Sequence, residues 1–332
     1  MVAPVEHTWP LLAIVGPTAS GKSALGLALA EKTGGEILNY DSVQIYRGFT
    51  IGSGSIAREA QRRIPHHLLD VLDPGKVFTA GDYRREALRV LSGVRERGRL
   101  PILVGGTGLY LRSLLQGLFE GPLRSEALRA RLRQADARHG PSFLHRLLAR
   151  RDAESAARIH PCDKQKLIRA IEVCLLSGQP LSVMLRQGRT GLEGFLVLKL
   201  GLDPPRPELH RRINRRVEAM YEAGLLEEVR AALAQPDGPR LKPLEALGYP
   251  QACAVLRGDL SVGEAIRQTQ AATRQYAKRQ MTWFRREEGV TWFRGFGDDL
   301  DIQRQVADWV SCRLSAASLP GGQWPRDNEP RA

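Results

Sequence analysis

Cysteine is scarce in this chain of 332 residues, and so are long apolar runs. The four cysteines, Cys162, Cys174, Cys253 and Cys312, form no C-x-x-C pair, so the sequence signals neither a zinc site nor a disulfide framework. No apolar run reaches the ~18 residues that a membrane span needs. The N-terminal segment carries Glu6 and no basic stretch, which is unlike a secretory signal. We therefore expect a cytoplasmic protein that does not cross a membrane.

Acidic residues are also under-represented relative to basic ones. The 36 Asp and Glu residues face 49 Lys and Arg residues, which gives a formal net charge of +13. Most of the basic residues are arginines, which suit bidentate phosphate contacts and stacking on bases. The charge is compatible with a nucleic-acid partner and equally with a merely soluble basic protein, and by itself it decides neither way.

Short apolar runs alternate with helical patterns in the first part of the chain. Segments 11–15, 36–39 and 100–104 are predicted strands, and segment 78–98 is a predicted helix. This alternation predicts an α/β fold with a parallel sheet. An Arg-rich helical insertion is expected over residues 122–194, between a core part at 1–121 and its completion at 195–315. The latter begins with a return strand at 195–200 and contains helices at 209–233 and 262–286. Residues 316–332, rich in Pro, Gly and charge, are expected to form a disordered tail.

A glycine-rich loop follows the first predicted strand. Its sequence matches GxxxxGK[ST] at every fixed position and precedes a helical pattern; the residues are Gly16, Pro17, Thr18, Ala19, Ser20, Gly21, Lys22 and Ser23. The two fixed glycines let successive backbone N–H groups point inward, Lys22 adds a mobile positive charge, and the Ser23 hydroxyl can hold Mg²⁺. The loop predicts binding of two linked phosphates, but it does not specify ATP.

Acidic and hydroxyl side chains follow two other predicted strands. ATP-hydrolysing enzymes with this loop usually carry an acid at the end of a neighbouring strand, but the strand at 101–104 ends in Gly-Gly-Thr107. The strand at 37–39 leads instead to Asp41. Because ligands lie at the carboxyl ends of parallel strands, Asp41, Thr107 and the loop should converge. From the residues alone, Asp41 is equally a general base or a Mg²⁺ ligand or cap.

The motifs taken together resemble the bacterial tRNA dimethylallyltransferases, the IPP transferase family. The resemblance covers roughly residues 10–295 in order. It rests on the segments 16–23, 41–46, 51–52, 65–70, 104–110, 157–161, 163–172, 248–249 and 273–283. The sequence departs from the family pattern at Pro250, where an arginine is expected after Gly248-Tyr249.

The resemblance implies a specific reaction. Members move the dimethylallyl group of dimethylallyl diphosphate to N6 of adenosine 37, next to the anticodon, in tRNAs that read codons starting with U. It also implies a P-loop NTPase-like core whose helical insertion grips the anticodon stem–loop. Mg²⁺ is implied as the cofactor without ATP, and a monomer without an obligate protein partner is expected.

Roles carried over from the resemblance agree with the residue pattern. The loop and Arg216 would hold the diphosphate, Asp41 would accept the N6 proton, and Thr107 would orient Asp41 or the base. Arg274, Lys278 and Arg285 share one helix face, which favours RNA contact. The residues expected at the tRNA are Asp41, Ser42, Val43, Gln44, Thr107, Gln165, Lys166, Leu167, Ile168, Arg169, Gly248, Tyr249, Arg274, Lys278, Arg279, Gln280, Trp283 and Arg285.

Three other functions compete with this prediction. A nucleotide-kinase type of enzyme shares the phosphate loop and the parallel sheet, but it would turn over ATP. A prenyltransferase acting on free adenine nucleotides has no need of a basic C-terminal helix. A non-enzymatic RNA-binding protein would not need an intact loop with Lys22 and Asp41.

Overall fold

The computed structural model describes residues 8–56, 58–119 and 121–316. These residues fall into two compact units, one formed by the described residues within 8–114 and 193–316 and the other by those within 115–192. Among the described helices, none has both the length and the apolar character of a membrane span. The predicted disordered tail lies outside the described residues, except for Ala316 at the end of the last helix.

The first unit is built on a sheet of six parallel strands, which confirms the predicted α/β class. The strand order is β3-β2-β4-β1-β5-β6. The strands are β1 Trp9–Val15, β2 Glu36–Asn39, β3 His66–His67, β4 Pro101–Val104, β5 Phe195–Leu202 and β6 Val290–Phe293. The two edge strands, β3 and β6, were not predicted, because two and four residues are too short to show a periodic pattern.

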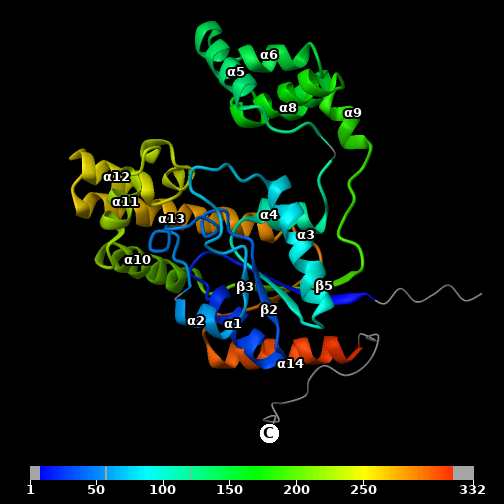
Figure 1. Cartoon of the computed structure of the whole chain (residues 1–332), viewed down its shortest axis with the longest axis vertical. Helices are drawn as coiled ribbons and strands as arrows, with labels where there is room; N and C mark the ends of the chain where they lie inside the picture. Colours follow the sequence, from blue (N-terminus) through cyan, green and yellow to red (C-terminus); the bar gives the residue numbers. More distant parts are fainter. Residues whose placement is uncertain (1–7, 57, 120, 317–332) are drawn as a thin grey trace, which may run out of the picture. The chain divides into compact units, whose positions relative to one another are not determined.

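Helices surround this sheet. They are α1 Lys22–Thr33, α2 Arg58–Arg63, α3 Ala80–Glu96, α4 Gly108–Leu115, α10 Arg206–Glu222, α11 Leu225–Leu233, α12 Tyr249–Arg257, α13 Val262–Phe284 and α14 Leu300–Ala316. The single helix predicted at 209–233 is two helices, because Gly224 between them has a φ of +99°. Capping boxes at Thr79 and Ser261 start α3 and α13. α10 packs beside α13, and α12 packs against both α11 and α13 (Figure 1).

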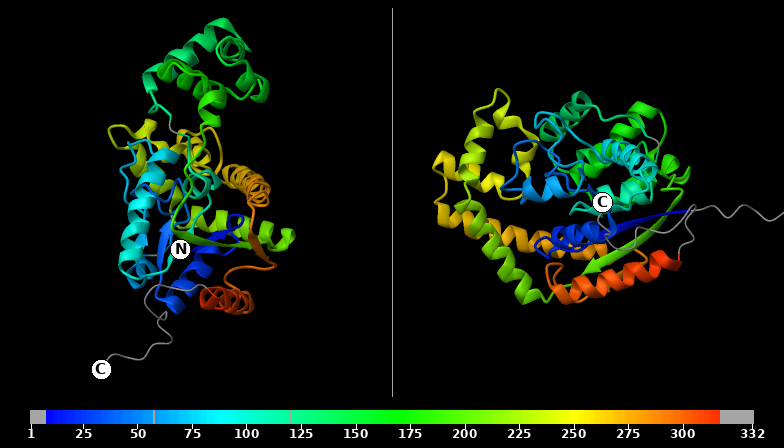
Figure 2. Two further views of the ribbon diagram at one scale, coloured as in Figure 1. Left: turned by 90° about the vertical axis from the view of Figure 1, so that its right-hand side faces the viewer. Right: turned by 60° about the horizontal axis from the view of Figure 1, so that its bottom comes forward.

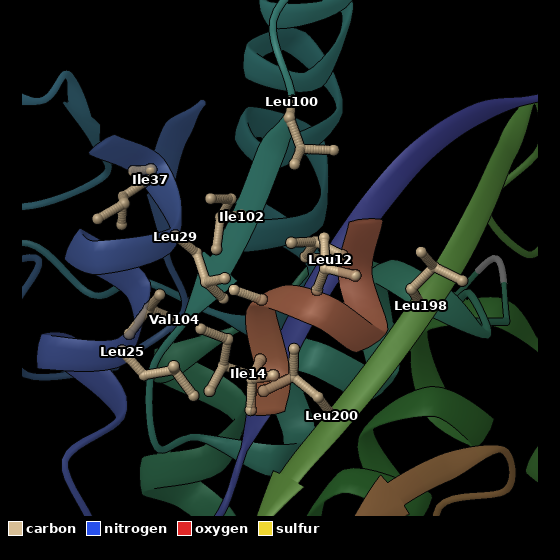
Figure 3. Close-up of a cluster of buried hydrophobic side chains, with 14 of the residues drawn as sticks. Leu12, Ile14, Leu25, Leu29, Ile37, Leu100, Ile102, Val104, Leu198 and Leu200 are labelled. Carbon is tan, nitrogen blue, oxygen red and sulfur yellow. The ribbon is translucent and has the colours of Figure 1, made fainter. Parts of the chain in front are cut away.

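The core that positions β1 lies between the sheet and two helices far apart in sequence. Alternate strand residues such as Leu12 and Ile14 are fully buried against Leu25 and Leu29 of α1 (Figure 3) and against α14. α3 contacts β2 and β4 on the other face (Figure 2). Strands buried on both faces are mostly apolar, which is why the short runs were visible in the sequence.

The second unit consists of helices alone. They are α5 Glu126–His139, α6 Phe143–Ala149, α7 Ala153–Arg158, α8 Lys164–Ser177 and α9 Leu181–Arg186. Its core includes Leu144, Leu148 and Ile171, all almost inaccessible to solvent. These residues hold the helices together by burial of apolar surface.

A buried carboxylate organises the second unit as well. Glu172 of α8 is fully buried and accepts bonds from the guanidinium groups of Arg129 (2.7 and 2.9 Å) and Arg169 (2.8 Å). It also accepts the Ser125 N–H at 2.8 Å. Burial alone raises the pKa of Glu172, but these hydrogen bonds outweigh burial and lower the pKa to about 2. The carboxylate therefore stays charged and ties α5 to α8.

Candidate active site

The phosphate loop leaves the end of β1 and turns directly into α1. Gly21, with φ +86°, is the N-cap of that helix, and a Cβ there would lie 2.7 Å from the Gly297 nitrogen. Gly16 has φ +145°, and a Cβ there would lie 3.0 Å from the backbone oxygen of Leu202. The Gly297 N–H donates to the Ser20 carbonyl at 2.9 Å, so the segment after β6 also holds the loop in place. Both fixed glycines of the motif are thus required by conformation and by packing.

Two cations without a carboxylate partner lie at this loop. Lys22 is 9% exposed, and its Nζ donates to the carbonyls of Gly16 (2.9 Å) and Pro17 (2.7 Å). Burial and the nearby charge of Arg216 lower the pKa of Lys22 to about 7, although Asp41 opposes them. Within the described residues, neither Lys22 nor Arg216 forms a salt bridge. An anion bound at the loop would supply the missing negative charge.

A cavity of about 340 Å³ opens in front of the loop. This volume is within the usual range for small-ligand sites. Its lining includes the loop residues Thr18 to Ser23 together with Asn39, Asp41, Gln44, Ser53, Gly54, Gly106, Arg216, Tyr276 and Gln280. Of the three features predicted to converge, the loop and Asp41 line this one cavity, whereas Thr107 is not among its lining residues.

Asp41 uses one of its two carboxylate oxygens to shape the turn after β2. Oδ1 accepts the N–H groups of Val43 (2.9 Å) and Gln44 (3.4 Å), and Asn39 Oδ1 accepts the Asp41 N–H at 3.0 Å. Oδ2 lies beside Gly106, 3.0 Å from where a Cβ on that glycine would be. Asp41 thus caps a turn, and no helix follows it. Its Oδ2 lies next to Gly106, which lines the same cavity as Asp41.

Thr107 acts on the backbone next to Asp41. Its hydroxyl accepts the Ser42 N–H at 3.0 Å and donates to the Ser42 hydroxyl at 3.1 Å. The Thr107 N–H donates to the Tyr40 carbonyl at 3.3 Å. Thr107 therefore fixes the chain on both sides of Asp41, whose carboxylate it does not bond in the described structure.

A second cavity, of about 260 Å³, adjoins the first and is more apolar. The two cavities share Thr18, Asp41, Ser53, Arg216 and Tyr276 as lining residues. The remaining wall of the second cavity includes Val43, Ile213, Val217, Met220, Leu225 and Tyr249. Asp41 thus lies where a polar, cationic compartment meets an apolar one.

The residues predicted on α13 divide into a buried and an exposed set. Gln280 is 5% exposed; its Oε1 accepts the Thr18 N–H at 2.7 Å and its Nε2 donates to the Gly106 carbonyl at 2.8 Å. Lys278 and Arg279 are exposed. Gln280 therefore bridges the phosphate loop to the turn after β4, a role that sequence reasoning missed.

Other predicted RNA contacts on this helix and at its end have partners within the protein. Arg274 donates to the Asn214 side chain at 2.7 Å, and Arg285 pairs with Asp203 at 3.3 Å. The ring of Trp283 packs under the Arg112 guanidinium, 4.1 Å from the ring centre. Of these three side chains, Arg285 is the one that is mostly exposed and so remains open to RNA.

The residues of the second unit that were predicted to contact tRNA also divide into exposed side chains and side chains that are buried or bonded within the protein. In the second unit, Gln165 and Lys166 are exposed, whereas the side chains of Leu167 and Ile168 are buried in the helical core. Arg169 is committed to Glu172 and to the Pro122 carbonyl. The exposed side chains of this segment are therefore Gln165 and Lys166, and Lys166 pairs with Asp163 at 2.6 Å.

Gly248 and Tyr249 have structural roles in the first unit. Gly248, with φ +96°, precedes α12, and Tyr249 is fully buried with its hydroxyl donating to Glu228 at 2.9 Å. Pro250, which replaces an expected arginine, is in the first turn of α12, where its missing N–H costs little. Glu228 itself was not predicted, because nothing near it in the sequence points to the site.

A parallel sheet whose first strand runs into this loop defines a P-loop NTPase-like α/β protein, with a loop of the kind that suits a phosphate-containing anion. The chain belongs to the IPP transferase family, whose pattern matches residues 44–287. It is 53% identical over 292 residues to the tRNA dimethylallyltransferase of Koribacter versatilis, covering 88% of this chain and 95% of that protein. It is 50% identical over 302 residues to the tRNA dimethylallyltransferase of Solibacter usitatus, covering 91% of this chain and 98% of that protein.

Solved structures agree with this membership. The full-length tRNA isopentenylpyrophosphate transferase of Bacillus halodurans is 36% identical with a TM-score of 0.68, covering 93% of this chain and 97% of that one. A eukaryotic dimethylallyltransferase acting on tRNA shares the fold, with a TM-score of 0.78 at 24% identity over 94% and 81% of the two chains.

Proposed function

We propose that this chain transfers the dimethylallyl group of dimethylallyl diphosphate to N6 of adenosine 37 in tRNAs that read codons starting with U. One observation carries the proposal: a carboxylate oxygen of Asp41 lies on the same cavity as the phosphate loop and two cations that have no carboxylate partner among the described residues. The names of the relatives support the tRNA acceptor and the prenyl group. Because its substrate is tRNA, we place the activity in the cytoplasm.

In the proposed reaction, the adenine N6 attacks the allylic carbon while the carbon–oxygen bond to the diphosphate breaks. The diphosphate leaves with the electron pair of that bond, and Asp41 Oδ2 takes the N6 proton. Loop N–H groups, Lys22 and Arg216 stabilise the negative charge that grows on the leaving group. Asn39 accepts the Asp41 N–H, and Thr107 bonds the residues on either side of Asp41, so that the carboxylate stays in position.

The wall of the cavity at the phosphate loop, where Ser23 lies, suits a magnesium ion. Ser23 lines this cavity, and the Ser/Thr hydroxyl at this position of a P-loop is a Mg²⁺ ligand, with substrate phosphates and waters supplying other ligands. Within the described part of the chain, no group of three or more His, Cys, Asp or Glu side chains is placed to hold a metal ion. When bound, the ion would neutralise charge on the leaving diphosphate.

The acceptor has to leave the anticodon-loop stack to reach Asp41. Extruding a base costs a few kcal/mol and is least costly in a loop. The apolar cavity beside Asp41 offers room for flat or hydrocarbon groups at the point of reaction. Exposed Lys278, Arg279 and Lys166 are the side chains that we propose for contact with the tRNA backbone.

The function is tested by offering labelled dimethylallyl diphosphate and Mg²⁺ to the protein with unmodified tRNA, AMP or ATP. We expect label on tRNA alone. Label on AMP would favour a prenyltransferase for free nucleotides, and phosphate release from ATP would favour a kinase; either result without labelled tRNA refutes the proposal.

The role of Asp41 is tested with Asp41→Asn. The amide keeps an oxygen to accept the Val43 N–H, so the turn is preserved while the proton acceptor is lost. We expect tRNA and pyrophosphate to bind as before, and transfer to fall by about 10²–10⁴. Turnover close to that of the wild type would remove Asp41 from the base role.

A further inference from the structure

The loop at residues 50–54, which precedes α2, supplies backbone groups to the wall of the site. The Gly54 carbonyl accepts Arg216 Nη2 at 3.2 Å and Gln44 Nε2 at 3.2 Å. Ser53 lines both cavities, and Gly54 lines the one at the phosphate loop. Gly54 is the hydrogen-bonding partner of Arg216 in the described structure, so the position of this guanidinium depends on the position of the loop.

A single carboxylate outside both cavities holds the loop. Glu228, in the first turn of α11, accepts the consecutive N–H groups of Thr50 (2.7 Å), Ile51 (2.7 Å) and Gly52 (3.0 Å). It also accepts the Tyr249 hydroxyl at 2.9 Å. Hydrogen bonds to an ionised acceptor are about twice as strong as neutral ones. Three adjacent amides on one carboxylate leave this segment little freedom to move.

Packing of Gly52 against Tyr249 and hydrogen bonds within the loop connect the residues bonded to Glu228 with Gly54. A Cβ on Gly52 would lie 2.5 Å from the Tyr249 ring, so only glycine lets the loop come this close. Beyond that point, the Gly54 N–H donates to the Ile51 carbonyl and the Ser55 N–H to the Thr50 carbonyl, both at 2.9 Å. The residues that Glu228 holds are therefore bonded directly to those that present the Gly54 carbonyl.

We propose that Glu228 is a positioning residue for the diphosphate site, which acts through residues 50–54 on Arg216. This inference rests on the proposed function, in which Arg216 binds the leaving diphosphate, but Glu228 itself touches no substrate. Without the carboxylate, the three N–H groups turn to water, the Gly54 carbonyl shifts, and Arg216 loses the acceptor that orients it.

The test compares Glu228→Gln with Glu227→Gln. Glu227 is the matched control, because it lies next to Glu228 on α11 but is largely exposed and pairs only weakly with Arg230 at 3.4 Å. Calorimetry gives the Kd for Mg²⁺-pyrophosphate and for dimethylallyl diphosphate. Hydrogen exchange reports on the amides at 50–52, and anisotropy gives tRNA affinity.

We expect Glu228→Gln to weaken pyrophosphate binding about tenfold, which is the worth of one hydrogen bond to a charged group. Exchange at residues 50–52 should accelerate, while tRNA affinity stays unchanged and Glu227→Gln behaves as the wild type. If Glu228→Gln does not fold, Glu228→Asp replaces it in the same measurements. The shorter aspartate keeps the negative charge but moves the carboxylate away from the N–H groups of residues 50–52.

A double-mutant cycle separates positioning from general loss of structure. In an Arg216→Ala background, Glu228→Gln should weaken pyrophosphate binding no further, since the group it positions is gone. An equal loss in both backgrounds, or no difference between the Glu228 and Glu227 variants, overturns the inference. A wild-type chain that binds pyrophosphate but prenylates no tRNA refutes the proposed function alone, and the Kd comparison still decides the role of Glu228.

Discussion

Replacing Gly54 by alanine tests how closely the loop at 50–54 and Arg216 are fitted to each other. Gly54 has φ +59°, and a Cβ there would lie 1.7 Å from Arg216 Nη2 and 2.6 Å from its Cζ. Non-bonded heavy atoms do not come that close, so the guanidinium has to leave its place. Gly48 is the matched control, because it has φ +79° and no neighbouring atom lies within 4 Å of where its Cβ would be.

The two variants share one cost and differ in another. Alanine in a left-handed conformation costs roughly 1–2 kcal/mol at either position, which urea unfolding should show for both. Only Gly54→Ala also displaces Arg216. Losing one charge-assisted bond to the diphosphate is worth about 1.5–3 kcal/mol, or about 10- to 150-fold in pyrophosphate affinity.

Titration calorimetry with Mg²⁺-pyrophosphate measures this difference directly. We expect Gly48→Ala to bind as the wild type does and Gly54→Ala to bind at least about tenfold more weakly, with kcat/KM for dimethylallyl diphosphate falling in parallel. If both variants bind pyrophosphate equally well, Arg216 does not act on the diphosphate from the position that the structure shows.

Three further predictions concern the bridge, the basic helix and the second unit. Gln280→Met removes the acceptor of the Thr18 N–H and one of two donors to the Gly106 carbonyl, and should slow transfer and weaken pyrophosphate binding without changing tRNA affinity by anisotropy; reduced tRNA affinity would mean direct RNA contact. Lys278→Gln should weaken tRNA binding and reduce the slope of log K against log salt by about one, and an unchanged slope would contradict a phosphate contact. The lowered pKa of Glu172, about 2 against 4.5, stabilises the fold above pH 4.5, and at most about 3 kcal/mol of this is lost as the pH falls to 2. Unfolding followed by circular dichroism should show an acid-induced loss of stability that is smaller in Glu172→Gln than in the wild type by up to this amount, and an equal loss in both would contradict the role of Glu172.

Much of the site could be predicted because its parts are contiguous in the sequence. The residues from Gly16 to Ser23 form one segment whose glycines, lysine and serine each have a stated physical role. The strands before Gly16, Asp41 and Gly105 are buried on both faces and are therefore mostly apolar. Parallel strands bring their carboxyl ends to one edge, so the meeting of the loop with Asp41 followed from the strand order of such a sheet.

The roles of individual polar side chains could not be predicted in this way. Gln280 and Arg274 both fall on a basic helix, yet one bridges the phosphate loop to Gly106 and the other bonds Asn214. Helical spacing tells which residues share a face, but it does not tell which face is buried when both carry polar groups. The same limit applied to Leu167 and Ile168, whose apolar side chains are core residues of the second unit.

The sequence by itself determined that this protein has a phosphate-binding loop on a parallel sheet and an aspartate at the same edge. These features depend on backbone conformation and on burial of short runs, both of which are local properties. Only the tertiary structure decided which groups support them: Gln280 reaches Thr18 across 262 positions, and Glu228 reaches Thr50 across 178. A hydrogen bond between residues so far apart depends on how whole helices pack, and no local pattern records it.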